Sequence, residues 1–141
     1  MNPDVSAGFP IPVVDQDTQP FWDGCARSEL LLQCCRKCQT WWHPPSPICP
    51  NCFSAEYDWT PSSGKGTVYT FSVIHHPFRR NWEALVPYVV GVIELEEGPH
   101  ILSNVVGVEP DAVEVGMRVA VSFEQMSDTI SLPLFRPEAY R

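Results

Sequence analysis

The sequence predicts a mainly β protein in which a short N-terminal helix and a small cysteine-rich ribbon precede a five-stranded barrel. Two observations predict this order. Two Cys-x2-Cys pairs lie close together between residues 35 and 52, and a series of short strand-like segments follows Pro61. Of the 141 residues, 44% are hydrophobic and 18% are charged, which is typical of a globular chain and not of a disordered one.

Three regions are expected along the chain. Residues 1–17 contain proline and aspartate without a hydrophobic period, and we expect a flexible arm that becomes ordered only on a partner. Residues 18–60 are expected to form the helix and the ribbon. Residues 61–141 are expected to form the barrel, because the turn-rich segment 61–64 is followed by a strand-like pattern.

The helix is expected to begin within the segment Asp17–Pro20 and to run to about Ser28. Aspartate and threonine at its start can cap the first turn, where the missing N–H of Pro20 costs no hydrogen bond. Gly24 is expected to keep the helix short. One side of this helix would carry Phe21, Trp22, Cys25 and Ala26.

The ribbon strands are predicted at Leu30–Gln33, Trp41–His43 and Tyr57–Trp59. Trp41 and Trp42 are adjacent on one strand and therefore face opposite sides. We expect one of them to pack on the cysteine turns and the other to be a candidate for exposure at an interface.

Cys35-x2-Cys38 and Cys49-x2-Cys52 form the motif that organises the chain. Four thiolates in two short pairs can surround one ion tetrahedrally, with each pair on a tight turn and no open coordination position. The connector between the pairs contains three prolines, as expected of a segment that folds back on itself. This ligand set predicts one structural zinc ion.

Alternatives to this assignment remain open. Iron can occupy the same cage, although the two pairs lie much farther apart in iron-carrying electron carriers. Disulfides are disfavoured, because six cysteines in 141 residues are fewer than a disulfide-built miniprotein needs. Cys34 offers another register with Cys38, but the Cys35–Cys38 spacing mirrors the second pair. Cys25 lies outside the ribbon and is expected to be a buried thiol.

One detail departs from the common pattern of such turns. Glycine often follows the second cysteine of a zinc knuckle, but here Gln39 and Phe53 hold those positions.

The barrel strands are predicted from alternating apolar residues between turn-forming residues. On the first strand, Val68, Thr70, Ser72 and Ile74 would face one side of the sheet and Tyr69, Phe71, Val73 and His75 the other. A turn at Gly98 would join the second and third strands as a hairpin. Five strands with a long excursion after the first fit a small Greek-key barrel of the OB type, whereas an immunoglobulin-like sandwich would need about seven. The predicted strands are Gly66–His75, Tyr88–Leu95, Ile101–Val106, Arg118–Glu124 and Thr129–Leu134.

Charge and targeting signals limit the function classes. The formal net charge is −8, with nine Lys and Arg against 17 Asp and Glu, which argues against binding of duplex nucleic acid. No apolar run approaches the length of a membrane span, and the N-terminal residues resemble neither a secretory signal nor an anchor. Reduced thiols without a targeting signal predict a cytoplasmic protein.

In combination, these segments resemble a family long catalogued as a domain of unknown function, which joins a rubredoxin-like zinc ribbon to an OB-fold and is associated with acyl-CoA metabolism. The resemblance covers about residues 18–137. The ordered set of segments is much more specific than the cysteine spacing alone. Besides the four ribbon cysteines, the matching segments are Pro20–Asp23, Gly64–Phe71, Pro87–Val90, Leu102–Gly107, Gly116–Val119 and Leu132–Phe135.

The resemblance implies an accessory subunit that is not itself catalytic. Members of the family accompany thiolases, thiolase-like lipid-transfer aldolases or hot-dog hydratases, for example in the degradation of aromatic or steroid side chains. The resemblance therefore implies a hetero-oligomer in which a thiolase-fold partner supplies the catalytic residues. This subunit would stabilise the partner and help to form the coenzyme A site.

Several residues are candidates for these contacts. Arg and Lys suit phosphate recognition, and the expected contacts with coenzyme A or another ligand are Lys65, His75, Arg79 and Arg80. The expected partner contacts are Phe21, Trp22 and Trp82. No catalytic residue is predicted, because no known nucleophile, metalloprotease or phosphate-loop motif is present. The alternative function is a binding module for single-stranded nucleic acid, a role in which both ribbons and OB-folds occur.

Overall fold

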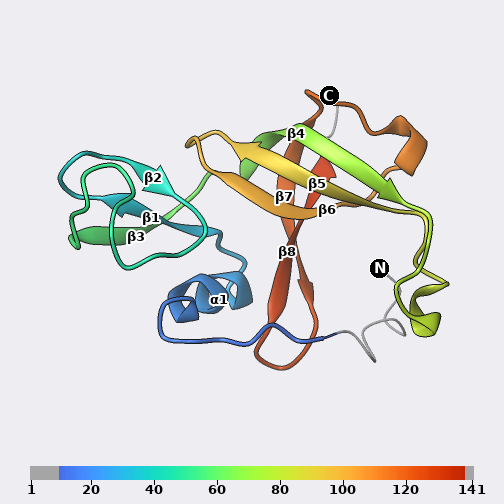
Figure 1. Ribbon diagram of the computed structural model, residues 1–141, viewed down its shortest axis with the longest axis horizontal. Coiled ribbons are helices and arrows are strands. Elements are labelled where there is room, and N and C mark those ends of the chain that lie inside the picture. Colours follow the sequence, from blue (N-terminus) through green and yellow to red (C-terminus); the bar gives the residue numbers. More distant parts are fainter. Residues whose placement is uncertain (1–9, 139–141) are drawn as a thin grey trace.

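The computed structural model describes residues 10–138, and within this range it confirms the predicted mainly β fold (Figure 1). None of the helices in this range has the length and hydropathy to cross a membrane. The elements are α1 (Gln19–Ala26), β1 (Leu31–Cys35), β2 (Trp41–Trp42), β3 (Tyr57–Pro61), β4 (Lys65–Ile74), η2 (Arg80–Trp82), β5 (Tyr88–Leu95), β6 (His100–Val105), η3 (Pro110–Ala112), β7 (Arg118–Gln125) and β8 (Ser131–Pro137).

The helix begins at Gln19, one residue later than a cap at Asp17 would give. Thr18 is the N-cap residue, but its side chain makes no capping bond to the helix. Instead, the Thr18 side chain accepts a hydrogen bond from the Asp15 N–H, while Asp15 accepts one from the Thr18 N–H (3.1 and 2.9 Å). This reciprocal pair fixes the chain as it enters α1. The proposed arm thus has an ordered C-terminal part, and its first nine residues lie outside the described range.

The ribbon is a three-stranded antiparallel sheet of order β2-β1-β3. Trp42 is buried and packs with Cys35 and Cys49, as predicted for one of the two tryptophans. Trp41 is not exposed, contrary to the other half of that prediction. It packs partly buried against the main hydrophobic core, because the ribbon lies against α1 and the barrel and does not stand alone.

The second sheet closes into a five-stranded barrel of order β4-β5-β6-β8-β7. The β5–β6 hairpin turns at Gly98, whose φ of 111° is a conformation that glycine adopts readily and residues with a Cβ atom adopt rarely. β8 extends past the predicted end at Leu134 to Pro137. Pro133 is tolerated in this strand because its missing N–H faces the seam with β6, so no ladder hydrogen bond to β7 is lost. The Pro133 carbonyl accepts a hydrogen bond from the Ser103 hydroxyl.

The predicted alternation along β4 holds only to Val68. A register shift between Val68 and Thr70 marks a β-bulge, after which the inward face moves to the odd-numbered residues. Phe71 and Val73 therefore pack against the core, whereas Thr70 is exposed. Bulges let a strand bend around a small barrel, and a period-2 pattern in the sequence does not reveal them.

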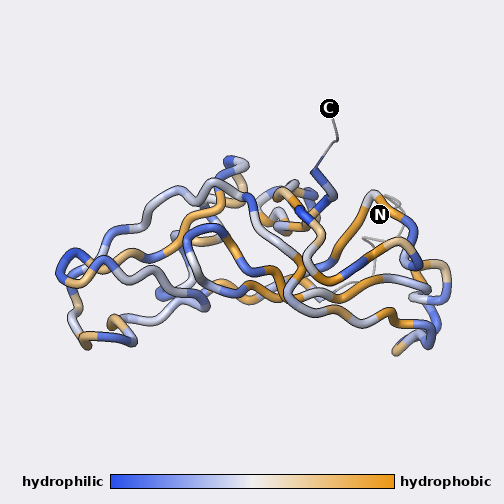
Figure 2. The backbone as a smooth tube through the Cα atoms, turned by 90° about the horizontal axis from the view of Figure 1, so that it is seen from above, coloured by the Kyte–Doolittle hydropathy of each residue, from blue (hydrophilic) through white to orange (hydrophobic). Residues whose placement is uncertain are grey.

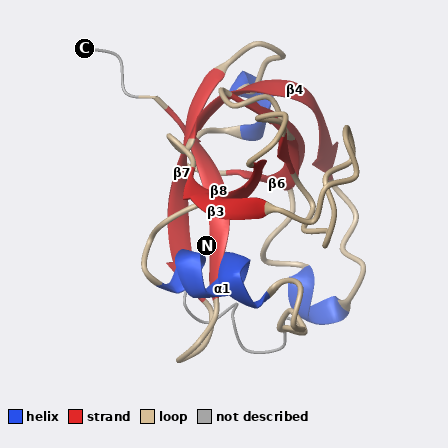
Figure 3. Cartoon of the chain, turned by 90° about the vertical axis from the view of Figure 1, so that its left-hand side faces the viewer, coloured by secondary structure: helices blue, strands red, loops and turns tan. Residues whose placement is uncertain are grey.

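One hydrophobic core joins the helix to the barrel. Phe21 and Cys25 of α1 and Leu32 of β1 belong to the same buried cluster as Ile93 and Phe135. Figure 2 shows the most hydrophobic backbone along the barrel strands, and Figure 3 shows α1 lying below β7 and β8. The helix therefore connects the ribbon to the barrel by burial of apolar surface.

A polar network also holds the linker between ribbon and barrel. The Glu97 carboxylate accepts hydrogen bonds from the Ser62 hydroxyl (2.6 Å) and the Ser63 N–H (2.9 Å). Glu96 accepts one from the Ser63 hydroxyl (2.9 Å) and pairs with Arg118 (2.8 Å). The β5–β6 turn thus fixes the linker at the point where β3 gives way to β4.

Candidate metal centre and ligand-facing surfaces

The two cysteine pairs occupy two turns with the same backbone geometry. The N–H groups of Gln39 and Phe53 each donate to the carbonyl of the first cysteine of their pair (3.1 and 3.0 Å). In the first turn, the N–H groups of Cys38 and Lys37 point at the Cys35 sulfur and lower the pKa of that thiol. N–H groups aimed at a sulfur favour its thiolate form, which is the form that binds a metal.

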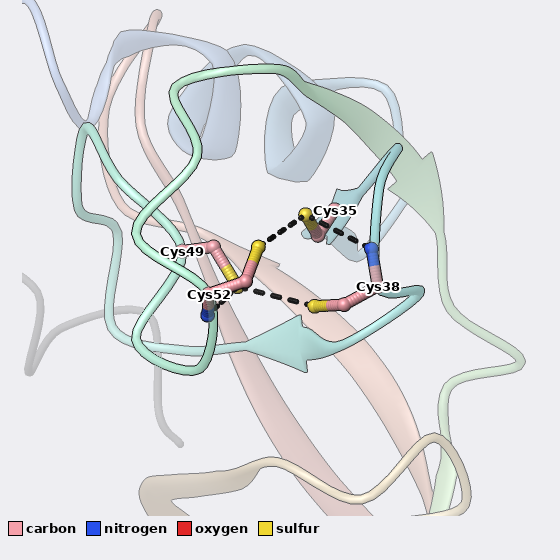
Figure 4. Close-up of side chains that lie close together, drawn as sticks. All are labelled: Cys35, Cys38, Cys49 and Cys52. Atoms are coloured by element: carbon pink, nitrogen blue, oxygen red, sulfur yellow. Dashed lines mark hydrogen bonds between the residues drawn. The ribbon is translucent and has the colours of Figure 1, made fainter.

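The four sulfurs converge on one point (Figure 4). All lie within 4.8 Å of one another, with 3.5 Å between Cys35 and Cys52 and 3.6 Å between Cys38 and Cys49. Sulfurs bound to one zinc at about 2.3 Å are about 3.8 Å apart, whereas a disulfide needs about 2.05 Å. The site therefore fits one structural zinc ion with four protein ligands and no open position for a substrate.

The position after each pair requires an unusual backbone conformation. Gln39 and Phe53 both have a φ of 63°, in the left-handed region that favours glycine. This is why many zinc knuckles carry glycine there. Here the turns form with larger side chains, and Phe53 remains 73% exposed.

The two other cysteines stay outside the cage. The Cys34 sulfur faces the carbonyls of Cys35 and Gln39 at 3.9 Å and does not belong to the converging group. Cys25 is fully buried, and burial raises the pKa of its thiol to about 12. The structure thus favours the Cys35–Cys38 register and an inert, buried Cys25.

The candidate coenzyme A contacts do not form one cluster. His75, Arg79 and Arg80 are exposed at the C-terminal end of β4 and in the excursion that follows. Lys65 is at the other end of this ten-residue strand, and a strand of that length spans roughly 30 Å. Lys65 also lies beside Glu96. The excursion thus gathers three of the four candidates, and Lys65 faces an acidic turn.

The excursion carries cations and aromatic rings together. Arg79 lies over the Trp82 ring, with 5.8 Å from its guanidinium carbon to the ring centroid. Phe78 meets the same ring edge-on at 6.4 Å and is itself 78% exposed. The electrostatic attraction between a cation and an aromatic face favours this arrangement.

Trp82 forms part of the wall of a large cavity of about 560 Å³. Most of the lining side chains are apolar, and the side chains with polar atoms are those of Trp82, Tyr88 and Asn104. Its lining includes Leu85, Tyr88, Val90, Asn104, Val106 and Leu132. This volume is in the range of small-ligand sites.

A second groove of about 330 Å³ lies between α1 and the barrel. Trp22 lines this groove and packs edge-on against Phe21, with 5.1 Å between ring centroids. The His43 ring also packs against Phe21, with 5.2 Å between ring centroids, and burial lowers the pKa of His43 to about 4. Phe21 is only 5% exposed, so it acts as a core residue; of the two helix aromatics, Trp22 alone is open to a partner.

Sequence reasoning missed the barrel residues of these cavities. Leu102 is 70% exposed at the rim of the groove, and Asn104 and Leu132 line both cavities. The available signal was the adjacent pair Ile101 and Leu102. Neighbouring residues on a strand face opposite sides, so two large apolar residues in succession place one of them outside the core.

Comparison with known protein families matches both parts of the chain. Residues 22–58 match the model described as the ChsH2 rubredoxin-like zinc ribbon domain. Residues 59–124 match the model described as the ChsH2 C-terminal OB-fold domain.

Individual relatives carry the same combination. A chain of the solved "Ltp2-ChsH2(DUF35) aldolase" is 36% identical and superposes with a TM-score of 0.83, covering 92% of this chain and 100% of that chain. A DUF35 domain-containing scaffold protein of Methanocaldococcus jannaschii is 39% identical over 95 residues, 67% of each chain. A probable enoyl-CoA hydratase alpha subunit of Thermomonospora curvata is 38% identical over 128 residues, which are 91% of this chain but 40% of that protein. The chain thus spans less than half the length of this hydratase subunit.

Proposed function

The chain belongs to the DUF35 family, whose members join a rubredoxin-like zinc ribbon to an OB-fold, and from this premise we propose that it is a non-catalytic accessory subunit of an acyl-CoA-processing complex. Its partner is a thiolase-fold subunit, either a thiolase or a lipid-transfer-type retro-aldolase, which supplies the catalytic groups. The observation that carries the proposal is the match along nearly the whole chain to a subunit of a solved aldolase.

The side chains support a role without catalysis. Between residues 10 and 138, the one hydrogen bond of a histidine ring joins His100 to Glu94 on the barrel surface (3.2 Å). No serine or cysteine in that range pairs with a histidine as a nucleophile pairs with its base. The zinc site has four protein ligands and no place for an activated water. The chain therefore stabilises its partner and leaves the reaction to it.

The excursion is the best candidate for contact with coenzyme A. Arg79 and Arg80 carry two adjacent positive charges in a chain of net charge −8, and no ion pair within residues 10–138 neutralises them. Guanidinium groups bind phosphate oxygens through paired hydrogen bonds. His75 is also exposed, directly after β4 and four residues before Arg79.

The adjacent cavity of about 560 Å³ suits the apolar part of an acyl thioester. Trp82 links the two features, because it lines the cavity and carries Arg79 on its ring. The phosphates would lie at the arginines and the acyl or pantetheine part along the apolar wall. The partner subunit completes this site and brings the reacting groups.

Trp22 and Trp82 are the proposed anchors of the partner. Both are half-buried and line cavities that open to the surface. Large aromatic residues in such pockets often contribute a few kcal/mol each to association. The tetrathiolate site needs reduced cysteines, so we place the complex in the cytoplasm.

Co-purification tests this function directly. The tagged chain is isolated from its native host, its partner is identified by mass spectrometry, and both the complex and the isolated chain are assayed for thiolysis and retro-aldol cleavage of acyl-CoA substrates. We expect a thiolase-fold partner and turnover by the complex alone. Turnover by the isolated chain would contradict the accessory role. Recovery of single-stranded nucleic acid in place of a protein partner would favour the alternative function.

A further inference from the structure

The barrel is closed only at one end of the seam between β6 and β8. Val105 and Phe135 are the one pair in register across it, in parallel orientation. The Val106 N–H donates to the Phe135 carbonyl (2.8 Å), and the Ser103 hydroxyl donates to the Pro133 carbonyl (2.7 Å). Figure 1 shows β8 crossing β6 and continuing with β7 toward α1. Toward the start of β6, the seam is therefore open.

The open part of the seam exposes backbone groups of Leu102. Along a strand, the N–H and C=O groups of successive residues point to opposite sides, so residues two or four positions apart point to the same side. Because the Val106 N–H points toward β8, those of Leu102 point to that same side and away from β5. Among residues 10–138, no backbone group pairs with Leu102 there. An unpaired strand edge of this kind is a template for another strand.

The groove beside this edge is apolar and uncharged. Its lining contains no Asp, Glu, Lys or Arg, although 18% of the chain is charged. His43 is neutral at pH 7, because burial lowers its pKa to about 4. Leu102 forms the rim and is 70% exposed. The other residues used here are Phe21, Trp22, Pro45 and Leu134.

We infer that this open seam receives an extended, uncharged, apolar segment of the partner subunit, which adds to the edge of β6 at Leu102. The inference rests on the proposed function for the existence of a partner. One residue of the segment would exchange backbone hydrogen bonds with Leu102. Its neighbours would alternate, so that one side chain enters the groove beside Trp22 and the next lies on the outer face.

Charge favours a partner over a second copy of this chain. Pairing of β6 with β6 would bring together two copies that each carry a net charge of −8, and like charges oppose such an association. An apolar segment of another protein meets no such repulsion and loses no charge solvation in an uncharged groove.

Hydrogen exchange at single-amide resolution tests the inference on the unmodified protein. The Leu102 amide is compared between the isolated chain and the purified complex. We expect fast exchange in the isolated chain and at least about tenfold slower exchange in the complex, as for an amide that gains a hydrogen bond. Ser103 is the internal control, because its amide points toward β5 and is already protected in the isolated chain.

A backbone variant separates pairing from side-chain contact. Leu102→Pro removes the unpaired N–H without breaking a bond to β5, whereas Leu102→Ala removes only the side chain. We expect Leu102→Pro to weaken assembly about tenfold more than Leu102→Ala, as for one lost hydrogen bond. If Leu102→Pro does not fold, Leu102→Asp is used, with Val115→Asp as its control at an equally exposed apolar residue outside both cavities.

The outcomes distinguish the two proposals. A complex that forms while the Leu102 amide stays unprotected and Leu102→Pro or Leu102→Asp binds normally overturns the seam inference but leaves the proposed function intact. Protection that grows with concentration of the isolated chain assigns the seam to a second copy and overturns it as well. Protection by coenzyme A alone would have the same consequence. If no protein partner is recovered, the proposed function fails and this inference fails with it.

Discussion

Gln39 and Phe53 show how metal ligation outweighs a local conformational preference. A residue other than glycine in the left-handed region costs roughly 1–2 kcal/mol, and both residues adopt it with a φ of 63°. Structural zinc contributes roughly 10–16 kcal/mol in small zinc-binding peptides. The metal therefore holds both turns even though neither carries the glycine that favours them.

The first residue-scale prediction concerns the ligand set. Cys49→Ser should reduce zinc from one per chain to nearly none and unfold the ribbon, because three remaining thiolates leave the site incomplete. Elemental analysis and thermal unfolding measure both effects. Cys34→Ser is the matched control and should keep its zinc. Loss of metal in Cys34→Ser with retention in Cys35→Ser would show that the register is wrong.

The second residue-scale prediction concerns pH. The folded pKa of His43 is about 4, against an ordinary value of 6.5, because burial disfavours the charged ring. Between pH 4 and pH 6.5, the unfolded chain binds more protons at this histidine than the folded chain does. The free energy of unfolding is therefore fully retained above pH 6.5 and decreases as the pH falls toward 4. The loss is at most about 1.4 kcal/mol per pH unit. Denaturant unfolding at pH 7.5 and 5.5 measures it.

Variants of the histidines assign this pH dependence. His43→Phe should reduce the loss of stability between pH 7.5 and 5.5, because no proton is then taken up at this position. His76→Phe, at an exposed histidine, should keep the wild-type loss. Acid release of zinc affects both variants alike. An unchanged pH dependence in His43→Phe would contradict the prediction.

At the scale of elements, the contact between α1 and β1 depends on the absence of a side chain. A Cβ atom on Gly24 would lie 2.7 Å from the Leu31 side chain and 2.9 Å from the Glu29 carbonyl. Helix propensity alone would favour alanine by about 1 kcal/mol. Glycine is nevertheless required here, because the close approach lets α1 lie against β1 and reach the barrel core through Phe21.

Gly24→Ala should therefore destabilise the protein by about 1–3 kcal/mol, as overpacking does, despite its better helix propensity. Chemical denaturation measures the change in the free energy of unfolding. Asp23→Ala, at the neighbouring exposed position, adds no atom beside β1 and loses only the exposed hydrogen bond that Asp23 accepts from the Gln19 side chain (2.7 Å), so it should shift stability by no more than about 0.5 kcal/mol. A stabilised Gly24→Ala would show that α1 can move away from β1 at no cost.

At the scale of the whole molecule, helix, ribbon and barrel share contacts that hold the two candidate surfaces on one framework. The common core and the linker network at Glu97 act together here. Trp22 and Leu102 border one cavity, and Trp82 borders the other, with Asn104 and Leu132 common to both. A partner seated on the groove would therefore lie next to the cavity and the arginines of the excursion.

The prediction at this scale separates ligand binding from assembly. Arg79→Ala combined with Arg80→Ala should raise the KM for acyl-CoA about tenfold in the reconstituted complex, because charge-assisted hydrogen bonds to phosphate are lost. The complex itself should remain intact by size-exclusion chromatography. Lys65→Ala is the control and should change neither quantity, since Lys65 lies at the far end of β4. An unchanged KM in the double variant would show that neither arginine contacts the acyl-CoA.

The sequence by itself determined the features that depend on local pattern. The cysteine spacing predicted the zinc site, the turn residues and apolar alternation predicted five barrel strands, and the ordered segments predicted the family; all three are confirmed. These signals arise within short stretches of chain, where ligand spacing and strand period act directly.

Only the tertiary structure decided which residues meet across the chain. It moved the inward face of β4 at the bulge after Val68, buried Phe21, separated Lys65 from Arg79 and opened the seam at Leu102. Each outcome depends on strand register, curvature or packing between segments distant in sequence. Because a shift of one residue exchanges the two faces of a strand, residue types alone do not fix which side chains form a surface.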